Sequence, residues 1–289
     1  MQILILDTNV AGFTPARELE GLAKRFTLRV SETALLERWV QSVRDYDDDR
    51  AQARGKFFNR LRSIAPFLDA VVPIAVGAGH LLRRVIAQAD GLPPVQATEE
   101  READLANQWK YIVTVGFNDE EWVTFARDHA GPHLDKLDAV LMGLARPAAD
   151  LAKRVSPELQ EMNKAFDALP DKEQQAHLLQ HIVETLRLSP AAAERLDGHV
   201  RNFVVRLQAA ARGRRMPKEN DGADLSLMAH LGEGHVLLTD ERQLVDVVDE
   251  SDTYQAPWVR RLDDLDELPE GPPWGESARE AARAFRRRR

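Results

Sequence analysis

Apolar residues form two unbroken runs, one near the start and one near the end of the chain. The first run is Ile3 to Leu6 and the second is Val236 to Leu238. Such runs are typical of strands in parallel sheets, which helices cover on both faces. Further short strand candidates are Thr27 to Val30 and Trp258 to Leu262. The two ends of the chain therefore predict one mostly parallel sheet.

The middle of the chain has a different pattern, in which apolar positions recur at helical spacing. Amphipathic runs such as Gln174 to Leu188 and Ala192 to Ala211 are separated by segments that contain Pro or Gly. Two short segments, Ala70 to Val76 and Tyr111 to Val115, are compatible with strands and also with the ends of helices. Helices therefore dominate this part of the chain.

These patterns divide the chain into three parts. We expect a three-layer α/β domain with a mostly parallel central sheet, built from residues 1–65 and 200–268. We expect residues 66–199 to form an α-helical insertion, as a lobe over or beside this domain. The breaker Gly271-Pro272-Pro273 then separates the fold from a basic C-terminal tail, which lies within residues 269–289.

The composition limits the classes of function that are open to the chain. Its 289 residues are 44% hydrophobic and 30% charged, which suffices for a sizeable core. The absence of cysteine excludes disulfides, zinc sites with thiolate ligands and a cysteine nucleophile. The first strand is not followed by GxGxxG, and no GxxxxGK[ST] loop is present. Because no membrane span or signal peptide is recognisable, we expect a soluble cytoplasmic protein.

Basic residues are concentrated locally, although the formal net charge is −8. Between Arg201 and Lys218 there are six basic residues and no acid, and the chain ends in four arginines. A polyanionic partner of an acidic protein would be held by such a local strip. The alternative is a solvated loop without a partner. The candidate nucleic-acid-binding residues are Arg212, Arg214, Arg215 and Lys218.

Both buried runs are followed directly by acids. Asp7 follows Leu6, and Thr239-Asp240-Glu241 follows Leu238. Sites in open parallel sheets form at the carboxyl ends of the strands, so these acids are expected to lie close together. Clustered carboxylates repel one another and persist mainly where a cation compensates them. With oxygen ligands alone, the expected ion is Mg²⁺ or Mn²⁺.

Two further acids lie on predicted helices. Ser31 is expected to cap a helix on which Glu37 lies off the apolar stripe. Asp224 is expected to face the packed side of its own helix, where a carboxylate needs a partner. Each acid also has a purely structural explanation. Asp7 can start a turn, Glu37 can be solvated, and Asp221 can cap the helix of Asp224.

The segments that carry these acids resemble those of the PIN-like nucleases. Ile5 to Val10 is similar to the family's opening strand and first acid, and Ser31 to Glu37 is similar to its second acidic element. Asp224 to Ala229 resembles the helix with the third acid, and Val236 to Leu244 resembles the strand and acid that follow it. The four segments occur in the family's order, while the helical middle has no such match.

The resemblance implies a PIN-like fold and a nuclease that uses Mg²⁺ or Mn²⁺, most often a ribonuclease. It implies Asp7, Glu37 and Asp224 as metal ligands. The fourth acid usually stands two residues after the threonine, which would be Glu241, and Asp240 is the alternative. Other polar residues would orient the ligands or a water molecule. These are Thr8, Asn9, Asp221 and Thr239.

Several alternatives remain open at the level of the sequence. The enzyme could act on structured or single-stranded DNA instead of RNA. The chain could also be a non-catalytic module of PIN-like fold that binds nucleic acid or protein. Members of the family are often dimers, so a homo-oligomer or a protein partner is compatible with the resemblance.

Overall fold

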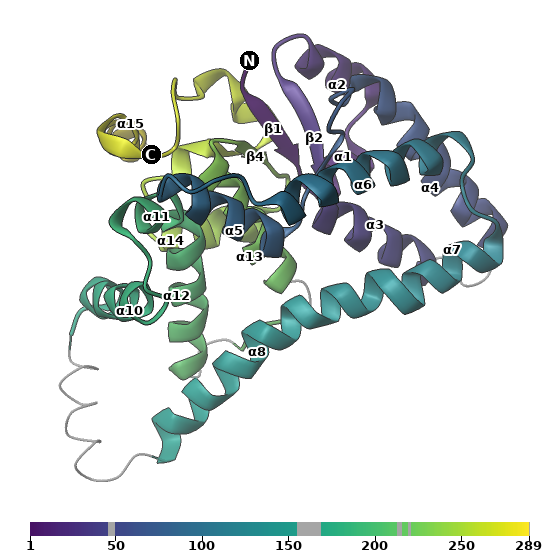
Figure 1. Ribbon diagram of the computed structural model, residues 1–289. Helices are drawn as coiled ribbons and strands as arrows, with labels where there is room; N and C mark the ends of the chain where they lie inside the picture. The colour runs from purple at the N-terminus through teal and green to yellow at the C-terminus, as the bar shows by residue number, and fades with distance from the viewer. Residues whose placement is uncertain (46–49, 155–168, 213–215, 219–220, 289) are drawn as a thin grey trace.

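The computed structural model describes residues 1–45, 50–154, 169–212, 216–218 and 221–288 (Figure 1). Five strands form one sheet in the order β3-β2-β1-β4-β5, and every neighbouring pair is parallel. The expected mostly parallel sheet of an α/β fold is thus parallel throughout. The strands are β1 (Ile3–Leu6), β2 (Thr27–Ser31), β3 (Ile74–Ala75), β4 (Val236–Leu238) and β5 (Val259–Arg260).

Helices cover both faces of this sheet. Successive side chains of a strand point to opposite faces, and Leu4, Ile5 and Leu6 are all fully buried. Among the described residues, no helix is both long and apolar enough to cross a membrane. The helices of the first half of the chain are α1 (Thr8–Phe13), α2 (Ala16–Ala23), α3 (Glu32–Arg44), α4 (Arg50–Ile64), α5 (Ala78–Ala89), α6 (Gln96–Thr114), α7 (Asp119–Phe125) and α8 (Gly131–Arg154). Those of the second half are α10 (Asp171–Thr185), α11 (Pro190–Arg195), α12 (Asp197–Ala211), α13 (Asp221–Met228), α14 (Arg242–Glu250) and α15 (Gly275–Arg288).

The three central strands end together at one edge of the sheet. Leu6 of β1 is paired with Val30 of β2 and with Leu238 of β4. The amide of Asp7 donates to the Leu238 carbonyl at 3.1 Å, so the pairing continues one residue beyond β1. Because parallel strands run in the same direction, the residues that follow them reach the same edge. Asp7 and Thr239 therefore lie next to each other.

The strand candidates of the sequence are confirmed, apart from one ambiguous segment. Thr27 to Val30 lies within β2, and the segments Ala70 to Val76 and Trp258 to Leu262 contain β3 and β5. Tyr111 to Val115, which fitted either type of structure, forms the end of α6. Tyr111 and Val115 lie one helical turn apart and are both exposed, as expected on the solvent face of a helix.

Part of the helical middle shares the main hydrophobic core with the central strands. Ile74 lies in β3 at the edge of the sheet, and Leu81, Leu105 and Trp109 join the core cluster of the central strands. The run from Ala192 to Ala211 is divided between α11 and α12. The segment expected as an insertion therefore completes the sheet and covers it.

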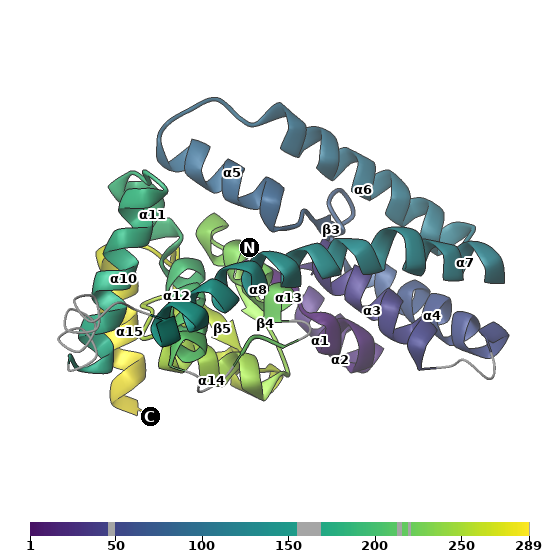
Figure 2. The ribbon, with the colours of Figure 1, turned by 90° about the horizontal axis from the view of Figure 1, so that it is seen from below.

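Helix α8 is the part of the middle segment that extends furthest from the sheet. Figures 1 and 2 show it running across the lower side of the molecule, where it packs against α12, α13 and α3. At its crossing with α13, a Cβ atom on Gly222 would stand 2.5 Å from the carbonyl carbon of Leu137. The Gly222 amide also donates to Asp138 Oδ1 at 2.8 Å. The missing side chain thus lets α8 approach the start of α13.

The C-terminal segment, expected as a basic tail, contains a docked helix. Ala278 and Ala282 of α15 are buried, because small residues let this helix lie close against the fold. Two of its arginines pair with acids of neighbouring elements. Arg279 Nη2 lies 2.5 Å from Glu194 Oε1, and Arg286 Nη2 lies 2.7 Å from Asp252 Oδ1.

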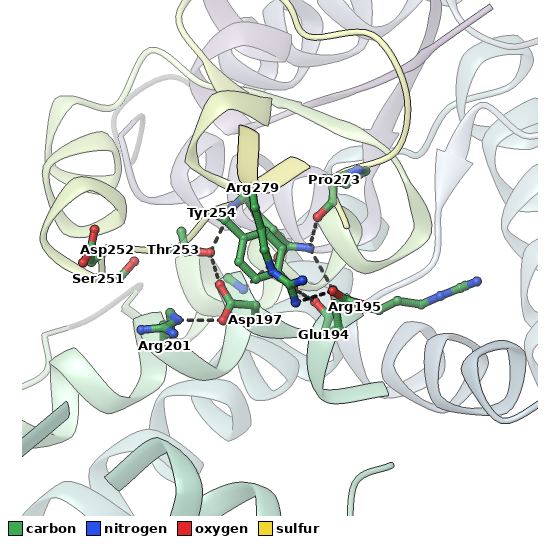
Figure 3. Close-up of polar contacts among 12 residues, drawn as sticks. Glu194, Arg195, Asp197, Arg201, Ser251, Asp252, Thr253, Tyr254, Pro273 and Arg279 are labelled. Atoms are coloured by element: carbon green, nitrogen blue, oxygen red, sulfur yellow. Dashed lines mark hydrogen bonds and ion pairs between the residues drawn. The ribbon is translucent and has the colours of Figure 1, made fainter. Parts of the chain in front are cut away.

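A polar network joins residues 253–255 to α11, to α12 and to the segment that precedes α15 (Figure 3). Thr253 donates to Asp197 Oδ2 at 2.6 Å, and the Tyr254 hydroxyl donates to the Glu194 carbonyl. Gln255 accepts from the Gly198 amide at 2.7 Å and donates to the Pro273 carbonyl at 2.9 Å. Buried polar groups that are satisfied in this way favour one arrangement of the packed elements. The network is structural and lies apart from the strand ends.

Candidate active site at the carboxyl ends of the strands

A cavity of about 260 Å³ lies at the carboxyl ends of the central strands. Four of the acids that the sequence singled out as metal ligands line it, and each comes from a different element. Asp7 follows β1, Glu37 lies in α3, Asp224 lies in α13, and Glu241 precedes α14. The full lining consists of Asp7, Thr8, Asn9, Glu37, Gln41, Lys218, Asp221, Asp224, Leu227, Glu241 and Gln243.

Asp7 is held by two hydrogen bonds at the start of α1. It caps the helix, since its Oδ1 accepts from the Val10 amide at 2.9 Å, and the Thr239 hydroxyl donates to its Oδ2. Burial raises the pKa of Asp7 to about 6, and the charge of Glu241 acts in the same direction. The hydrogen bonds from Thr239 and Val10 oppose this rise. Asp7 therefore starts a helix where the sequence suggested a turn, and it also lines the cavity.

Glu37 enters the cavity from α3, which begins at Ser31. The Ser31 hydroxyl accepts from the Ala34 amide at 2.9 Å, as the sequence predicted for the cap of this helix. The Thr8 hydroxyl donates to Glu37 Oε2. Burial raises the pKa of Glu37 to about 7, and the negative charges of Glu241 and Asp7 contribute. Glu37 is thus not a freely solvated helix residue.

Asp224 and Asp221 share one buried cation. Arg206 of α12 donates from Nη1 to Asp221 Oδ1, and its Nη2 lies 3.3 Å from Asp224 Oδ2. Burial raises the pKa of Asp224 well above its usual range, and Glu241 adds to this, while Arg206 counteracts it. Asp221 Oδ2 also accepts from the Lys218 amide at 2.7 Å, so Asp221 fixes the approach to α13.

Arg206 is a site residue whose role the sequence did not reveal. It belongs to the basic run that suggested a local strip for a polyanionic partner, yet its side chain is almost completely buried. The feature of the sequence that could have revealed this role is its position directly after the apolar pair Val204-Val205, in α12. A charged residue inside such a run predicts a buried partner of opposite sign.

The two acids after Thr239 have different surroundings. Glu241 lines the cavity, and its charge acts on the pKa of Asp7, Glu37 and Asp224. Asp240 is about half exposed, is not part of the lining, and has its Oδ1 3.9 Å from Arg261 Nε. The buried hydroxyl of Thr239 accepts from the Glu241 amide at 3.0 Å. This hydrogen bond fixes the backbone turn from which the side chains of Asp240 and Glu241 point in different directions. The geometry favours Glu241 over Asp240.

The donor set fits a hard divalent cation by its chemistry. The four acids offer carboxylate oxygens to the cavity, and Mg²⁺ and Mn²⁺ prefer such ligands. In the described part of the chain, no group of three His, Asp or Glu side chains is arranged as a metal site. Here the carboxylates of Asp7, Glu37 and Asp224 contact Thr239, Thr8 and Arg206 instead. Metal binding would therefore exchange some of these contacts.

Of the two described residues of the predicted basic strip, Arg212 and Lys218, one reaches the cavity. Lys218 lines the cavity, next to Asp221. Arg212 donates to Gln174 Oε1, away from the lining. Arg214 and Arg215 lie outside the described residues. No protein-family model, no curated protein and no solved structure matches the chain.

Proposed function

We propose that the chain is a metal-dependent nuclease that hydrolyses phosphodiester bonds in RNA. The observation that carries the proposal is the cavity lined by Asp7, Glu37, Asp224 and Glu241 from four separate elements. Acids brought together in this way raise one another's pKa and are stabilised by a cation. The resemblance of the surrounding segments to PIN-like nucleases supports the same reaction. It also favours RNA as the substrate.

The chain's own residues would have distinct tasks in this reaction. Asp7, Glu37, Asp224 and Glu241 would hold Mg²⁺ or Mn²⁺, with Thr239 and Thr8 fixing the first two carboxylates. The ion would lower the pKa of a water molecule and offset negative charge on the phosphate. The cavity lining also offers one cation and several amide donors to phosphate oxygens. These are Lys218, Asn9, Gln41 and Gln243.

Cleavage assays with purified protein test this proposal directly. Labelled RNA and DNA, each single-stranded and duplex, are incubated with Mn²⁺, with Mg²⁺ and with EDTA. We expect cleavage of RNA that requires the ion and that Asp7→Asn abolishes, because the substitution removes one anionic ligand.

Three results would contradict parts of the proposal. Cleavage of DNA but not of RNA would make DNA the substrate class. Cleavage that persists in Asp7→Asn would separate activity from the cavity. Binding of RNA by wild-type protein without cleavage in either ion would support a non-catalytic module.

A further inference from the structure

An exposed aromatic ring lies beside the cavity, at the end of α1. Phe13 is 66% exposed, and the guanidinium carbon of Arg38 lies 4.8 Å from the centre of its ring. A single exposed apolar residue is common on protein surfaces. This ring differs because an arginine stacks on it and a second arginine, Arg60, stands close by.

The second arginine is fixed by backbone carbonyls at the C-terminal end of α1. Arg60 of α4 donates from Nε to the Ala11 carbonyl at 2.8 Å and from Nη2 to the Thr14 carbonyl at 2.6 Å. Burial and the nearby charge of Arg38 lower the pKa of Arg60, so the two positive charges are close enough to repel each other. Within the described residues, neither arginine has a carboxylate partner. Two adjacent cations without an acid suit an anionic ligand.

Helix geometry connects this pair of side chains with the cavity. On α1, Phe13 lies four residues after Asn9, which lines the cavity. On α3, Arg38 lies three residues before Gln41, which lines it as well. Residues three or four apart on a helix are neighbours on one face. Both side chains therefore lie about one helical turn, roughly 5 Å, beyond the lining.

We propose that Phe13, Arg38 and Arg60 form a binding site for an unpaired nucleotide of single-stranded RNA, next to the cavity. The base stacks on Phe13, and the phosphate contacts the two arginines. Aromatic rings with adjacent cations are the usual means of holding single strands without reading their sequence. A base within a duplex cannot stack on such a ring because both of its faces are covered. This inference rests on the proposed function, because it takes RNA as the substrate, and it adds that the RNA is single-stranded.

The test measures binding in EDTA, where no metal-dependent cleavage interferes. A short fluorescent RNA is titrated with protein, once as a single strand and once annealed to its complement. The variants are Phe13→Ala, Phe13→Trp and Arg38→Gln. The matched controls are Val71→Ala, which removes another exposed apolar side chain, and Arg83→Gln, which removes an exposed arginine on α5.

We expect Phe13→Ala to weaken single-strand binding about tenfold or more, since stacking on an aromatic side chain contributes roughly 1–3 kcal/mol per base. Phe13→Trp should retain the affinity, because it keeps a stacking surface. Arg38→Gln should flatten the dependence of log affinity on log salt by about 0.7. The two controls should bind the single strand like wild type. Binding to the duplex should not respond to Phe13→Ala.

Two results would overturn the inference. One is single-strand affinity that Phe13→Ala leaves unchanged, and the other is an equal loss for single strand and duplex. If wild type still cleaves RNA with Mn²⁺ in that case, the proposed nuclease stands without this subsite. If Phe13→Ala weakens single-strand binding but wild type cleaves nothing, the subsite stands and the nuclease proposal fails. Wild-type protein that binds no single-stranded RNA contradicts the subsite outright.

Discussion

Asp7 and Glu37 are acids whose surroundings oppose ionisation. Burial is the main cause, and the remaining acids of the cavity add repulsion. One hydroxyl donor for each carboxylate, Thr239 for Asp7 and Thr8 for Glu37, acts in the opposite direction. The hydroxyls also fix the directions of the carboxylates. The arrangement is therefore strained without a cation and ordered enough to receive one.

This strain predicts how stability depends on pH without metal. The pKa of Asp7 is about 6 in the folded chain against 3.8 for the free side chain. Above pH 4 the unfolded chain loses this proton first, so stability is lost as the pH rises towards 6. The loss amounts to roughly 3 kcal/mol. Asp7→Asn should remove this loss of stability, because the Asn side chain does not ionise and can still cap α1.

Thermal unfolding in EDTA checks this expectation. The Tm of Asp7→Asn should exceed that of wild type above about pH 6, and the difference should shrink at lower pH. With Mn²⁺ the order should reverse, since ligand binding stabilises only the protein that retains the site. A Tm difference that does not change with pH would show that Asp7 ionises as freely as in solution.

The pair Asp240 and Glu241 gives a test between adjacent residues. Glu241 lines the cavity, whereas Asp240 is about half exposed and faces Arg261. Glu241→Gln should raise the Mn²⁺ concentration needed for half-maximal cleavage by tenfold or more, equivalent to about 1.4 kcal/mol. Asp240→Asn should stay within about twofold of wild type. The reverse order in a metal titration would assign the ligand to Asp240.

Single residues of the site could be predicted only in part. Apolar runs that end at an acid sufficed to place Asp7 and the acid after Thr239 at one sheet edge. Which of Asp240 and Glu241 faces the cavity depends on the turn at Thr239, whose hydroxyl donates to Asp7, and the sequence does not display this long-range contact. The partner of Asp224 was missed for the same reason. Arg206 lies 18 residues away on another helix.

At the scale of elements, the crossing of α8 with α13 determines how Asp221 and Asp224 are presented. The backbones of the two helices are in contact where Gly222 has no side chain. The Gly222 amide is also satisfied by Asp138 of α8. Any shift of α8 would therefore move the start of α13. The two acids beside Gly222 would move with it.

Gly222→Ala tests this crossing. Its Cβ would meet backbone atoms of Leu137, which cannot turn away as a flexible side chain could. Overpacking of this kind costs about 1–3 kcal/mol, and we expect that loss in the free energy of unfolding together with lower cleavage activity. Gly143→Ala is the matched control on α8, where a Cβ meets nothing within 4 Å. It should stabilise the chain by up to about 1 kcal/mol. Equal effects of the two substitutions in urea unfolding would contradict the close crossing.

Among the elements, the sequence identified the helices and strands better than their partners. Unbroken apolar runs located β1 and β4, because such runs require cover on both faces. Thr27 to Val30 was a separate strand candidate that proved to lie within β2. Periodicity placed Ile74 in a separate helical lobe, although the residue is part of the edge strand β3. A strand of two residues carries almost no periodic signal. The docking of α15 was missed because its apolar face consists mostly of alanines, which attract no attention in an arginine-rich segment.

For the whole molecule, the net charge of −8 opposes the approach of a polyanion. Salt screens this field beyond about 8 Å at physiological ionic strength, so charges near the cavity determine binding. The described cations near it include Lys218 in the lining, the pair Arg38 and Arg60 beside it, and the buried Arg206, which Asp221 and Asp224 already share. These lie close to four acids, which a bound metal ion would offset. The cavity therefore accepts a strand best when the ion is present.

The salt dependence of RNA binding tests the basic strip next to the cavity. Each phosphate contact with a single strand contributes about −0.7 to the slope of log affinity against log salt. Lys218→Ala should therefore flatten the slope by about 0.7, and Arg212, Arg214 and Arg215 replaced together by Ala should flatten it by about 2. Lys110→Ala removes an exposed lysine on α6 and serves as the control.

Because lysine and arginine do not ligate cations, Mn²⁺ affinity should barely change in any of these variants. A slope that changes for Lys218→Ala and not for the triple variant would confine the contact to the cavity lining. A slope that neither variant changes would exclude this strip from the path of the strand. The path would then pass over Arg38 and Arg60, where Arg38→Gln alone should alter the slope. Salt titrations of the three variants together thus show whether RNA crosses the carboxyl edge of the sheet over the basic strip or over Arg38 and Arg60.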